Sequence, residues 1–150
     1  MTEISRTYTF NAPPDRVWQL LMDTKVLASC IPGCERLEPD PSAEHRYRVK
    51  LAVKLAAVMG TYDGSVQLVD IQPAKSYGLV AEGRGLPGFV NGKASIALSS
   101  ADNKTMLNVA GEVNAGGAIA RVGQRLITSA ARMMMDRFFE SIKAIAETQA

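Results

Sequence analysis

Five segments in which apolar and polar residues alternate follow one another between residues 45 and 113. They are HRYRVKLAVKL (45–55), TYDGSVQLVDI (61–71), KSYGLVAEG (75–83), FVNGKASIALS (89–99) and KTMLNVAGEV (104–113). A repeat of two residues is typical of a half-buried β-strand, and the Gly, Pro, Asn and Asp residues between the segments indicate tight turns. Strands joined by tight turns pair antiparallel, so we expect this region to form an antiparallel meander with one apolar face.

The residues on either side of the meander predict a first strand and three helices. EISRTYTF (3–10) alternates and is rich in β-branched and aromatic residues, which favours a strand. Residues 13–23 and 24–33 have helical spacing, with prolines at the start of the first segment and Pro32-Gly33 at the end of the second. From residue 116 to 149 the apolar spacing is helical again. One side of this segment carries Ile119, Val122, Leu126, Ala130, Met133 and Met134.

The last helix is the only predicted element large enough to cover the apolar face of the sheet. We therefore expect an α+β fold in which a curved antiparallel sheet wraps around a long C-terminal helix, with two short helices after the first strand. A chain of 150 residues that is 47% hydrophobic and 21% charged suits one soluble domain spanning residues 1–150.

Composition and targeting signals argue against several classes of protein. A net charge of +2 and an aromatic content of 6% do not favour nucleic-acid binding, which needs a basic stripe or stacking rings. The N-terminal residues MTEISRTYTF lack the apolar core of a secretory signal, and no apolar run is long enough for a membrane span. Cys30 and Cys34 do not make a disulfide framework, so we expect a cytoplasmic protein.

The glycines of EGRGLPGFVNG (82–92) match the dinucleotide fingerprint G-x-G-x-x-G through Gly83, Gly85 and Gly88. That fingerprint requires a helix that opens at the last glycines, because its N–H groups hold the phosphates. Here an alternating segment follows instead, so a nucleotide site is not expected. The glycines favour a turn and a bend in the sheet, or open space beside an internal cavity.

The residues that could carry catalysis do not form a recognisable set. His45 is the only histidine, which argues against a metal site built on imidazoles. Cys30 and Cys34 are four residues apart, without the C-x-x-C spacing of redox motifs. Asp63 falls on the outer side of its strand if Tyr62 points inward. We therefore expect no catalytic residue, no metal ligand and no enzymatic activity.

Four stretches resemble a known family, in the order in which they occur along the chain. They are CIPGCE (30–35), GTYDGSV (60–66), GRGLPGFVNGKASIAL (83–98) and GGAIARVGQRLITSAARMMMDRFFESI (116–142). The sequence resembles the START-like (SRPBCC) helix-grip superfamily and, within it, the CoxG family of carbon monoxide dehydrogenase subunits. The resemblance implies an internal apolar cavity and a role beside a molybdenum hydroxylase of the carbon monoxide dehydrogenase type. It also implies handling of the lipophilic quinone that takes that enzyme's electrons.

The resemblance further implies recruitment of the hydroxylase to the membrane, and many members of the family continue past the last helix into a tail that can reach the bilayer. Because this sequence stops at Ala150, we do not expect anchoring through such a tail. Any contact with the inner face of the cell membrane would then be peripheral.

Most of the candidate ligand-binding residues are those expected to face the interior. Periodicity alone favours a filled core, whereas the family resemblance favours a cavity, and small residues facing a curved sheet would leave room for one. Tyr62 or Arg137 would orient a polar ring oxygen, although Arg137 would reach solvent if the apolar stripe drifts near the helix end. The candidates on strands are Tyr62, Val66, Leu68, Leu79, Ala81, Phe89, Ala94, Ile96, Leu107 and Val109. Those on the helix are Gly123, Leu126, Ala130, Met133, Met134 and Arg137.

Basic residues line up on the outer side of the strand 45–55, at Arg46, Arg48, Lys50 and Lys54. Such a row is usually a solvated face, but it would also suit docking of an acidic protein or anionic lipid headgroups.

Taken with this resemblance, the sequence predicts a non-enzymatic protein that binds a lipophilic molecule, which the resemblance implies is a quinone, without a covalent cofactor. Two alternatives stay open at this point. One is a cyclase-like or hydrolase-like enzyme of the same superfamily, and the other is an adaptor with a solid core that docks through its basic face.

Overall fold

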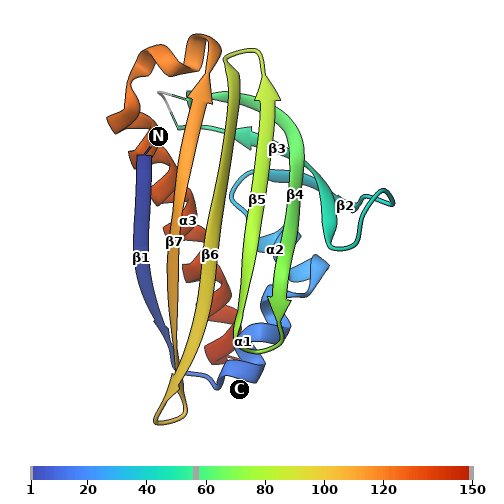
Figure 1. Ribbon diagram of the computed structural model, residues 1–150, viewed down its shortest axis with the longest axis vertical. Helices are drawn as coiled ribbons and strands as arrows, with labels where there is room; N and C mark the ends of the chain where they lie inside the picture. Colours follow the sequence, from blue (N-terminus) through green and yellow to red (C-terminus); the bar gives the residue numbers. More distant parts are fainter. Residues whose placement is uncertain (1, 56–57, 149–150) are drawn as a thin grey trace.

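The computed structural model describes residues 2–55 and 58–148 (Figure 1). Its elements are β1 (Thr2–Phe10), α1 (Pro14–Leu21), α2 (Thr24–Cys30), β2 (Cys34–Pro39), β3 (Arg46–Val53), β4 (Gly60–Gln72), β5 (Ser76–Gly85), β6 (Gly88–Ala101), β7 (Lys104–Gly116), the 3-10 helix η2 (Gly117–Val122) and α3 (Gln124–Thr148). The strands form one sheet in the order β1-β7-β6-β5-β4-β3-β2, and every neighbouring pair is antiparallel. The predicted fold class is confirmed, since α3 lies along one face of this curved sheet and α1 and α2 follow β1.

The two short helices begin where local chemistry favours them. Pro14 is the first residue of α1, where a missing N–H costs nothing, and Asp15 lies in the first turn. Asp23 caps α2, because its carboxylate accepts hydrogen bonds from the backbone N–H groups of Lys25 and Val26. Both helices contact α3 and close one end of the space between α3 and the sheet (Figure 1).

Strand β2 was not expected from the sequence. Its residues CERLEP do not alternate in burial, because β2 lies at the edge of the sheet and pairs only with β3. The register shifts between Cys34 and Arg36, which further disrupts the period of two. A short, irregular edge strand therefore leaves no alternating signal in the sequence.

The last helix begins later than predicted, and this changes which of its residues are buried. The predicted helix starts at residue 116, but η2 occupies Gly117–Val122 and Gly123, with φ of 96°, separates it from α3. A 3-10 helix has three residues per turn, so a stripe extrapolated through it at 3.6 residues per turn is out of phase. The buried residues of α3 are Ile127, Thr128, Phe139, Ile142 and Ala146. Leu126 and Met133, predicted to face inward, are 48% and 42% exposed.

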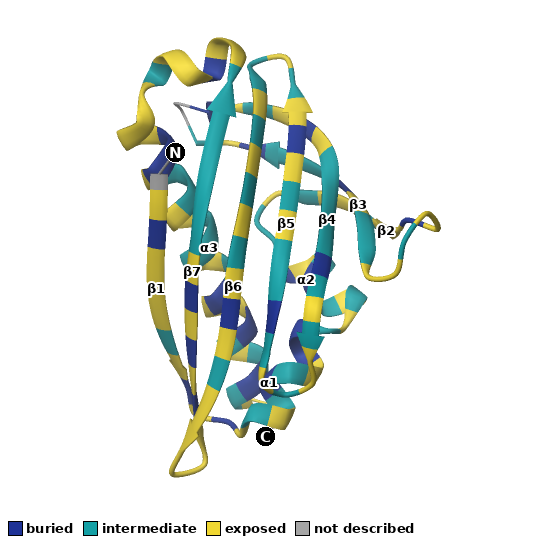
Figure 2. Cartoon of the chain, in the orientation of Figure 1, coloured by how far each residue is buried: buried dark blue, intermediate teal, exposed yellow. Residues whose placement is uncertain are grey.

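A well-filled core occupies the end of the molecule that α1 closes. Phe10, Leu21, Leu107 and Ile142 are at most 1% exposed there. Tyr8 stacks on Phe139 with ring centroids 4.6 Å apart, and the Trp18 and Tyr77 rings meet edge to face at 5.6 Å. Figure 2 shows the buried positions of β6 and β7 concentrated in this half of the sheet. Large side chains on facing elements leave this half solid.

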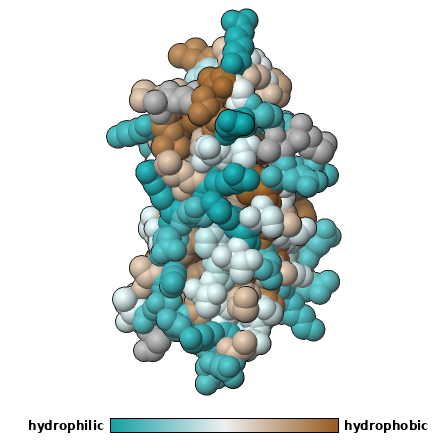
Figure 3. Space-filling view, turned by 90° about the vertical axis from the view of Figure 1, so that its left-hand side faces the viewer, coloured by the Kyte–Doolittle hydropathy of each residue, from teal (hydrophilic) through white to brown (hydrophobic). Residues whose placement is uncertain are grey.

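The opposite end of the molecule has a smaller core and a more apolar surface. Val53, Val58, Tyr62 and Ile119 form its buried cluster. On the side of the molecule that carries β1 and α3, hydrophobic side chains gather toward this end (Figure 3). The two halves of the interior therefore differ, and the candidate site lies in the less filled one.

Candidate functional site

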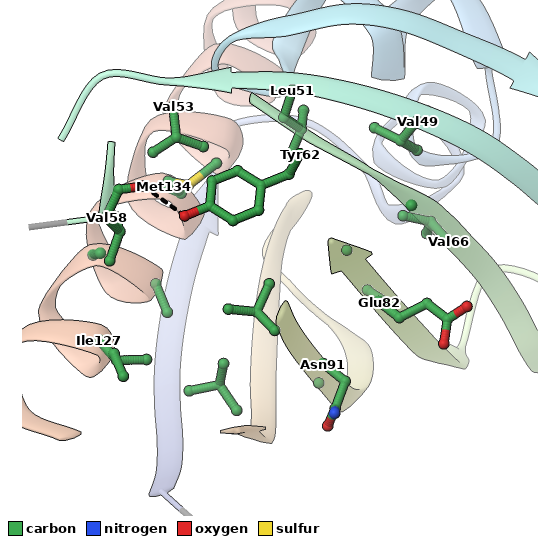
Figure 4. A pocket seen from close by; sticks show the side chains of 18 of the residues that line it. Val49, Leu51, Val53, Val58, Tyr62, Val66, Glu82, Asn91, Ile127 and Met134 are labelled. Carbon is green, nitrogen blue, oxygen red and sulfur yellow. Dashed lines mark hydrogen bonds between the residues drawn. The ribbon is translucent and has the colours of Figure 1, made fainter. Parts of the chain in front are cut away.

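An apolar cavity of about 260 Å³ lies between α3 and the sheet, next to the smaller core (Figure 4). Strands β3 to β7 form one wall, and η2 and the first half of α3 form the other. The lining residues are Val49, Leu51, Val53, Val58, Tyr62, Gly64, Ser65, Val66, Ala81, Glu82, Gly83, Val90, Asn91, Gly92, Val113, Ile119, Ile127, Ala130, Ala131 and Met134.

Beside the cavity, inward-facing positions of three neighbouring strands are glycine. Gly64 on β4 pairs with Gly83 on β5, and Gly92 on β6 pairs with Ala81 on β5. A Cβ on Gly83 would lie 3.7 Å from Tyr62 Cβ and 3.8 Å from Val90 Cγ2, so its absence leaves usable space. In the other half of the sheet, the inward residues are large, and the same gap between α3 and the sheet is filled.

Gly64 has a second role, because the backbones of β4 and β5 approach closely there. A Cβ on Gly64 would overlap the carbonyl oxygen of Glu82 and would lie 2.7 Å from the Cα of Gly83. The sequence left two interpretations of the nearby glycine-rich stretch, a bend in the sheet and open space beside a cavity. Gly64 illustrates the close backbone approach, and Gly83 leaves the space.

The walls of the cavity are almost entirely carbon, and Tyr62 supplies the polar group. Its hydroxyl donates a hydrogen bond of 2.7 Å to the carbonyl oxygen of Val58, and burial raises the pKa of the phenol. Among the described lining residues, only Tyr62 and Glu82 can ionise, and Glu82 is exposed. The side chains of Glu82 and Asn91 point away from Tyr62 in Figure 4. The site is therefore suited to holding an uncharged apolar molecule.

Five of the predicted ligand-binding residues line this cavity, namely Tyr62, Val66, Ala81, Ala130 and Met134. Six others belong to the filled half instead. Leu68, Ile96, Leu107 and Val109 are buried in the large core, and Leu79 and Ala94 pack against it. Their inward orientation is as predicted, but the core there leaves no room beside them. Whether any of these residues contacts a ligand stays a prediction.

Phe89, a candidate ligand-binding residue, does not line the cavity. On β6 the inward positions are Val90, Gly92, Ala94 and Ile96, and Phe89 lies on the outer face, 40% exposed. Its ring covers Gly116, where a Cβ would overlap the ring atoms.

Two of the residues missed by the sequence interpretation lie one position away from residues that it chose. Val90 follows Phe89, and Ile127 follows Leu126, and both line the cavity. Gly123, also predicted to face a ligand, is exposed, with open space where a Cβ would be. Val49, Leu51 and Val53 on β3 were recognised as one face of a strand but not as cavity walls. The alternating pattern of β3 contains that signal, whereas the correct phase of α3 depends on the break at Gly123.

Arg137 lies outside the apolar cavity. It is exposed, and it borders a separate groove of about 510 Å³ that is also lined by Pro32, Cys34, Glu35 and Lys54. Of the two alternatives that the sequence left for Arg137, a contact with the ligand and a side chain in solvent, the structure shows the second.

The two cysteines are free thiols. Cys30 is buried and Cys34 is half-buried, and burial raises the pKa of Cys34.

The basic row on β3 is partly neutralised. The Nε atoms of Arg46 and Arg48 lie 3.2 Å and 3.7 Å from Oδ2 of Asp40. Lys50 is half-buried and faces Asp63 across the β3–β4 pair, while Lys54 is exposed. Docking through this row stays a prediction, with less unpaired charge than the sequence alone indicates.

The described residues hold no group of three or more His, Cys, Asp or Glu side chains placed to bind a metal ion. Within residues 2–55 and 58–148, no helix has the length and apolarity needed to cross a membrane.

Comparison with solved structures places this architecture among known proteins. A conserved protein from Geobacillus kaustophilus has 32% sequence identity and a TM-score of 0.93, over 98% of this chain and 96% of that one. A protein from Chromobacterium violaceum has 15% identity and a TM-score of 0.75, over 97% and 96% of the two chains. The Zhui aromatase/cyclase from a Streptomyces species has 17% identity and a TM-score of 0.71, over 97% and 93%. The last two share the fold alone.

A search of curated proteins finds no match. A family model, however, matches residues 7–147. It describes CoxG, a subunit of carbon monoxide dehydrogenase, and the fold around the cavity is the helix-grip type that the sequence resemblance implied. The chain therefore belongs to the CoxG family of carbon monoxide dehydrogenase subunits.

Proposed function

We propose that this protein binds the ring of a quinone in its apolar cavity and serves as an accessory protein to a molybdenum hydroxylase of the carbon monoxide dehydrogenase type. The observation that carries the ligand proposal is the apolar cavity of about 260 Å³ between α3 and the glycine-lined part of the sheet. Membership of the CoxG family supports the accessory role, because the family is named as a subunit of that enzyme.

The size of the cavity limits what fits. A cavity of about 150 Å³ lined by leucine, isoleucine and phenylalanine side chains accommodates benzene. A space of about 260 Å³ therefore suits a head group of one or two fused rings but not a long isoprenoid chain. The chain of a natural quinone would have to leave the cavity and lie elsewhere on the protein or in a membrane. Burial of the ring against valine, isoleucine and methionine side chains would provide most of the binding free energy.

The polarity of the cavity favours an uncharged ligand. A carboxylate or phosphate would lose its hydration without gaining a cationic partner, because the described lining residues include no Lys or Arg. The Tyr62 hydroxyl already donates to Val58, so its oxygen is available to accept a hydrogen bond from a quinol. A quinone carbonyl would need the hydroxyl to turn away from Val58.

The same lining favours binding over catalysis. Acid–base chemistry requires a side chain that can exchange a proton near neutral pH, and burial instead raises the pKa of Tyr62. The cavity also favours a carrier over an adaptor with a solid core.

The ligand proposal is tested by titrating the purified protein with menadione, a naphthoquinone without an isoprenoid chain, by calorimetry. Ala81→Leu places a larger side chain in the cavity and is expected to weaken binding at least about tenfold, since leucine fills volume that the ring would occupy. Ala97→Leu makes the same change at an exposed position of β6 and is the matched control. Binding that is absent from the wild type, or equal in the two variants, would refute the proposed site.

The accessory role is tested separately. The tagged protein is mixed with a purified molybdenum hydroxylase of the carbon monoxide dehydrogenase type, and complex formation is measured by size-exclusion chromatography. A stable complex is expected, and two proteins that elute independently would contradict the accessory role while leaving ligand binding intact.

A further inference from the structure

A groove beside the cavity lies between the α2–β2 connection, the end of β3 and α3. Its volume is about 510 Å³, and it is lined by residues 32–35, residues 52–55 and two side chains of α3. The first two walls are tied together, because Ala52 N–H donates a 2.9 Å hydrogen bond to the carbonyl oxygen of Gly33. A Cβ on Gly33 would overlap that of Ala52's own carbonyl oxygen, so the two backbones are in close contact. The shape of the groove is therefore fixed by the fold.

The groove and the apolar cavity share two lining residues, Val53 and Met134. Met134 packs against the buried cluster that contains Val53 and Tyr62 (Figure 4). A methionine side chain has three rotatable bonds and adapts its shape to its neighbours. A rotation of Met134 would therefore join the groove to the cavity.

The groove supplies the positive charge that the cavity lacks. The described lining residues of the cavity include no Lys or Arg, whereas the groove carries Lys54 and Arg137. Both are exposed, and neither makes an ion pair with any residue that the structure describes. Lys54 follows Val53 in the chain, and Arg137 lies about one turn of α3 after Met134. Each of the two shared residues therefore has a cation next to it.

The other ionisable side chains of the groove reduce this charge without cancelling it. Glu35 is the acidic residue among the described lining residues, and it is exposed. Burial raises the pKa of the Cys34 thiol, which is therefore uncharged near neutral pH. Two cations and one carboxylate leave a net charge of +1, which matches a ligand with a single negative charge.

We propose that the groove and the cavity together bind a medium-chain fatty acid. Lys54 and Arg137 hold the carboxylate, and the alkyl chain passes between Val53 and Met134 into the cavity. The carboxylate stays in contact with water in the open groove, so it avoids the cost of burying a charge. The chain leaves water for a space whose walls are almost entirely carbon. A neutral amphiphile would use the cavity without the cations, and an inorganic anion would use the cations without the cavity.

This inference goes beyond the proposed function, because it gives the cavity a second class of ligand. A cavity of about 260 Å³ does not hold an alkyl chain and a quinone ring at once. That a fatty acid displaces a quinone rests on the proposed function, whereas fatty-acid binding itself does not.

The test is calorimetric titration of the full chain with octanoate and, in parallel, with octanol at neutral pH. The two probes have chains of the same length, and only octanoate is charged. We expect octanoate to bind more tightly than octanol, and added salt to weaken octanoate binding alone. From pentanoate to octanoate, the affinity should rise about fourfold with each methylene group that enters the cavity.

Charge variants test the place of the carboxylate. Lys54→Gln with Arg137→Gln should lower the affinity for octanoate about tenfold and leave the affinity for octanol unchanged, because each exposed cation contributes modestly. Glu35→Gln removes the acidic group of the groove and should strengthen octanoate binding about twofold. Arg125→Gln with Arg132→Gln removes two exposed cations of α3 that line neither space, and it is the matched control.

Ala81→Leu tests the place of the chain. The larger side chain narrows the cavity and should weaken the binding of octanoate and octanol alike, whereas the exposed Ala97→Leu should change neither. The chain-length series uses the wild-type protein, so it tests the same point even if Ala81→Leu does not fold.

Three results would overturn the fatty-acid proposal. They are a wild-type protein that does not bind octanoate, equal octanoate affinities in the two double charge variants, and an affinity that does not rise with chain length. Menadione titration separates this proposal from the proposed function. Menadione binding without octanoate binding refutes the fatty-acid site alone, and octanoate binding without menadione binding refutes the quinone site alone.

Discussion

The phenol of Tyr62 on β4 donates its hydrogen bond across the cavity wall to the carbonyl oxygen of Val58, four residues earlier in the chain. This bond of 2.7 Å is buried, and it fixes the residue that closes the cavity next to the exposed Met59. The Tyr62 hydroxyl thus holds Val58 in the cavity wall, in addition to any contact that it makes with a ligand.

Tyr62→Phe is expected to destabilise the fold. The variant keeps the ring but leaves the buried Val58 carbonyl without its partner, at a cost of about 1–3 kcal/mol in the free energy of unfolding. Urea denaturation measures this cost. Tyr47→Phe removes a hydroxyl from the half-buried inward face of β3 and should change stability by less than about 0.5 kcal/mol. Equal losses in the two variants would show that the Val58 bond contributes nothing specific.

The two paired glycines of the cavity wall should respond oppositely to alanine. At Gly83 an added methyl group makes ordinary contacts with Tyr62 and Val90, so Gly83→Ala should be neutral or stabilise by up to about 1 kcal/mol. At Gly64 the methyl group would overlap the Glu82 carbonyl, so Gly64→Ala should cost more than about 2 kcal/mol. Thermal denaturation of both variants tests this. A Gly64→Ala variant as stable as the wild type would contradict this prediction.

Stability should fall in alkali because of Tyr8. Burial, followed by the 2.6 Å hydrogen bond from its hydroxyl to Asp136, raises the pKa of Tyr8. The unfolded chain releases the phenolic proton near its ordinary pKa of about 10, whereas the folded protein retains it to higher pH. The stabilisation is therefore fully present below about pH 10 and is lost as the pH rises toward the folded pKa. Urea denaturation across this range should show a shallower decline for Tyr8→Phe, and parallel curves would contradict the assignment.

Asp40 should have the opposite pH dependence. The backbone N–H and side chain of Ser42, and then Arg48 and Arg46, hold the pKa of Asp40 below its usual value. Its contribution to stability is therefore present above about pH 4 and is lost as the pH falls through the lower folded pKa. Asp40→Asn should be less stable than the wild type at neutral pH and should converge with it in acid. A constant difference at all pH values would exclude this linkage.

Much of the fold could be predicted because its signals are local. The alternation of Tyr47, Val49, Leu51 and Val53 identifies both the strand β3 and its buried face, since side chains alternate strictly along a strand. Phe89 could have been placed outward on the same ground, because it is out of phase with Ala94 and Ile96. Strand β2 could not be predicted in this way, because an edge strand with a register shift has no regular buried face.

The candidate site was only half predictable. The choice of Leu126 and Met133 over Ile127 and Ala131 followed from extending one helical period through η2, whereas Gly123 resets the phase. A turn of 3-10 helix rotates the next helix about its axis, and that rotation is decided by how the connection packs on the sheet. Ile119 N–H bonding to the Pro87 carbonyl is part of that packing, and no local pattern encodes it.

The sequence by itself determined the order of the regular elements other than β2 and η2, the antiparallel pairing of the meander strands and most of the residues that face the interior from the sheet, because these depend on periodicity and turn residues along the chain. Only the tertiary structure decided where the interior is hollow. Gly64, Gly83 and Gly92 line the cavity on the sheet side and Ala130 and Ala131 line it on α3, while Leu68, Ile96 and Leu107 belong with Phe139 and Ile142 to the large core that fills the other half. Whether small residues leave space depends on which side chains face them across the core, and that is a property of the packed structure rather than of any one segment.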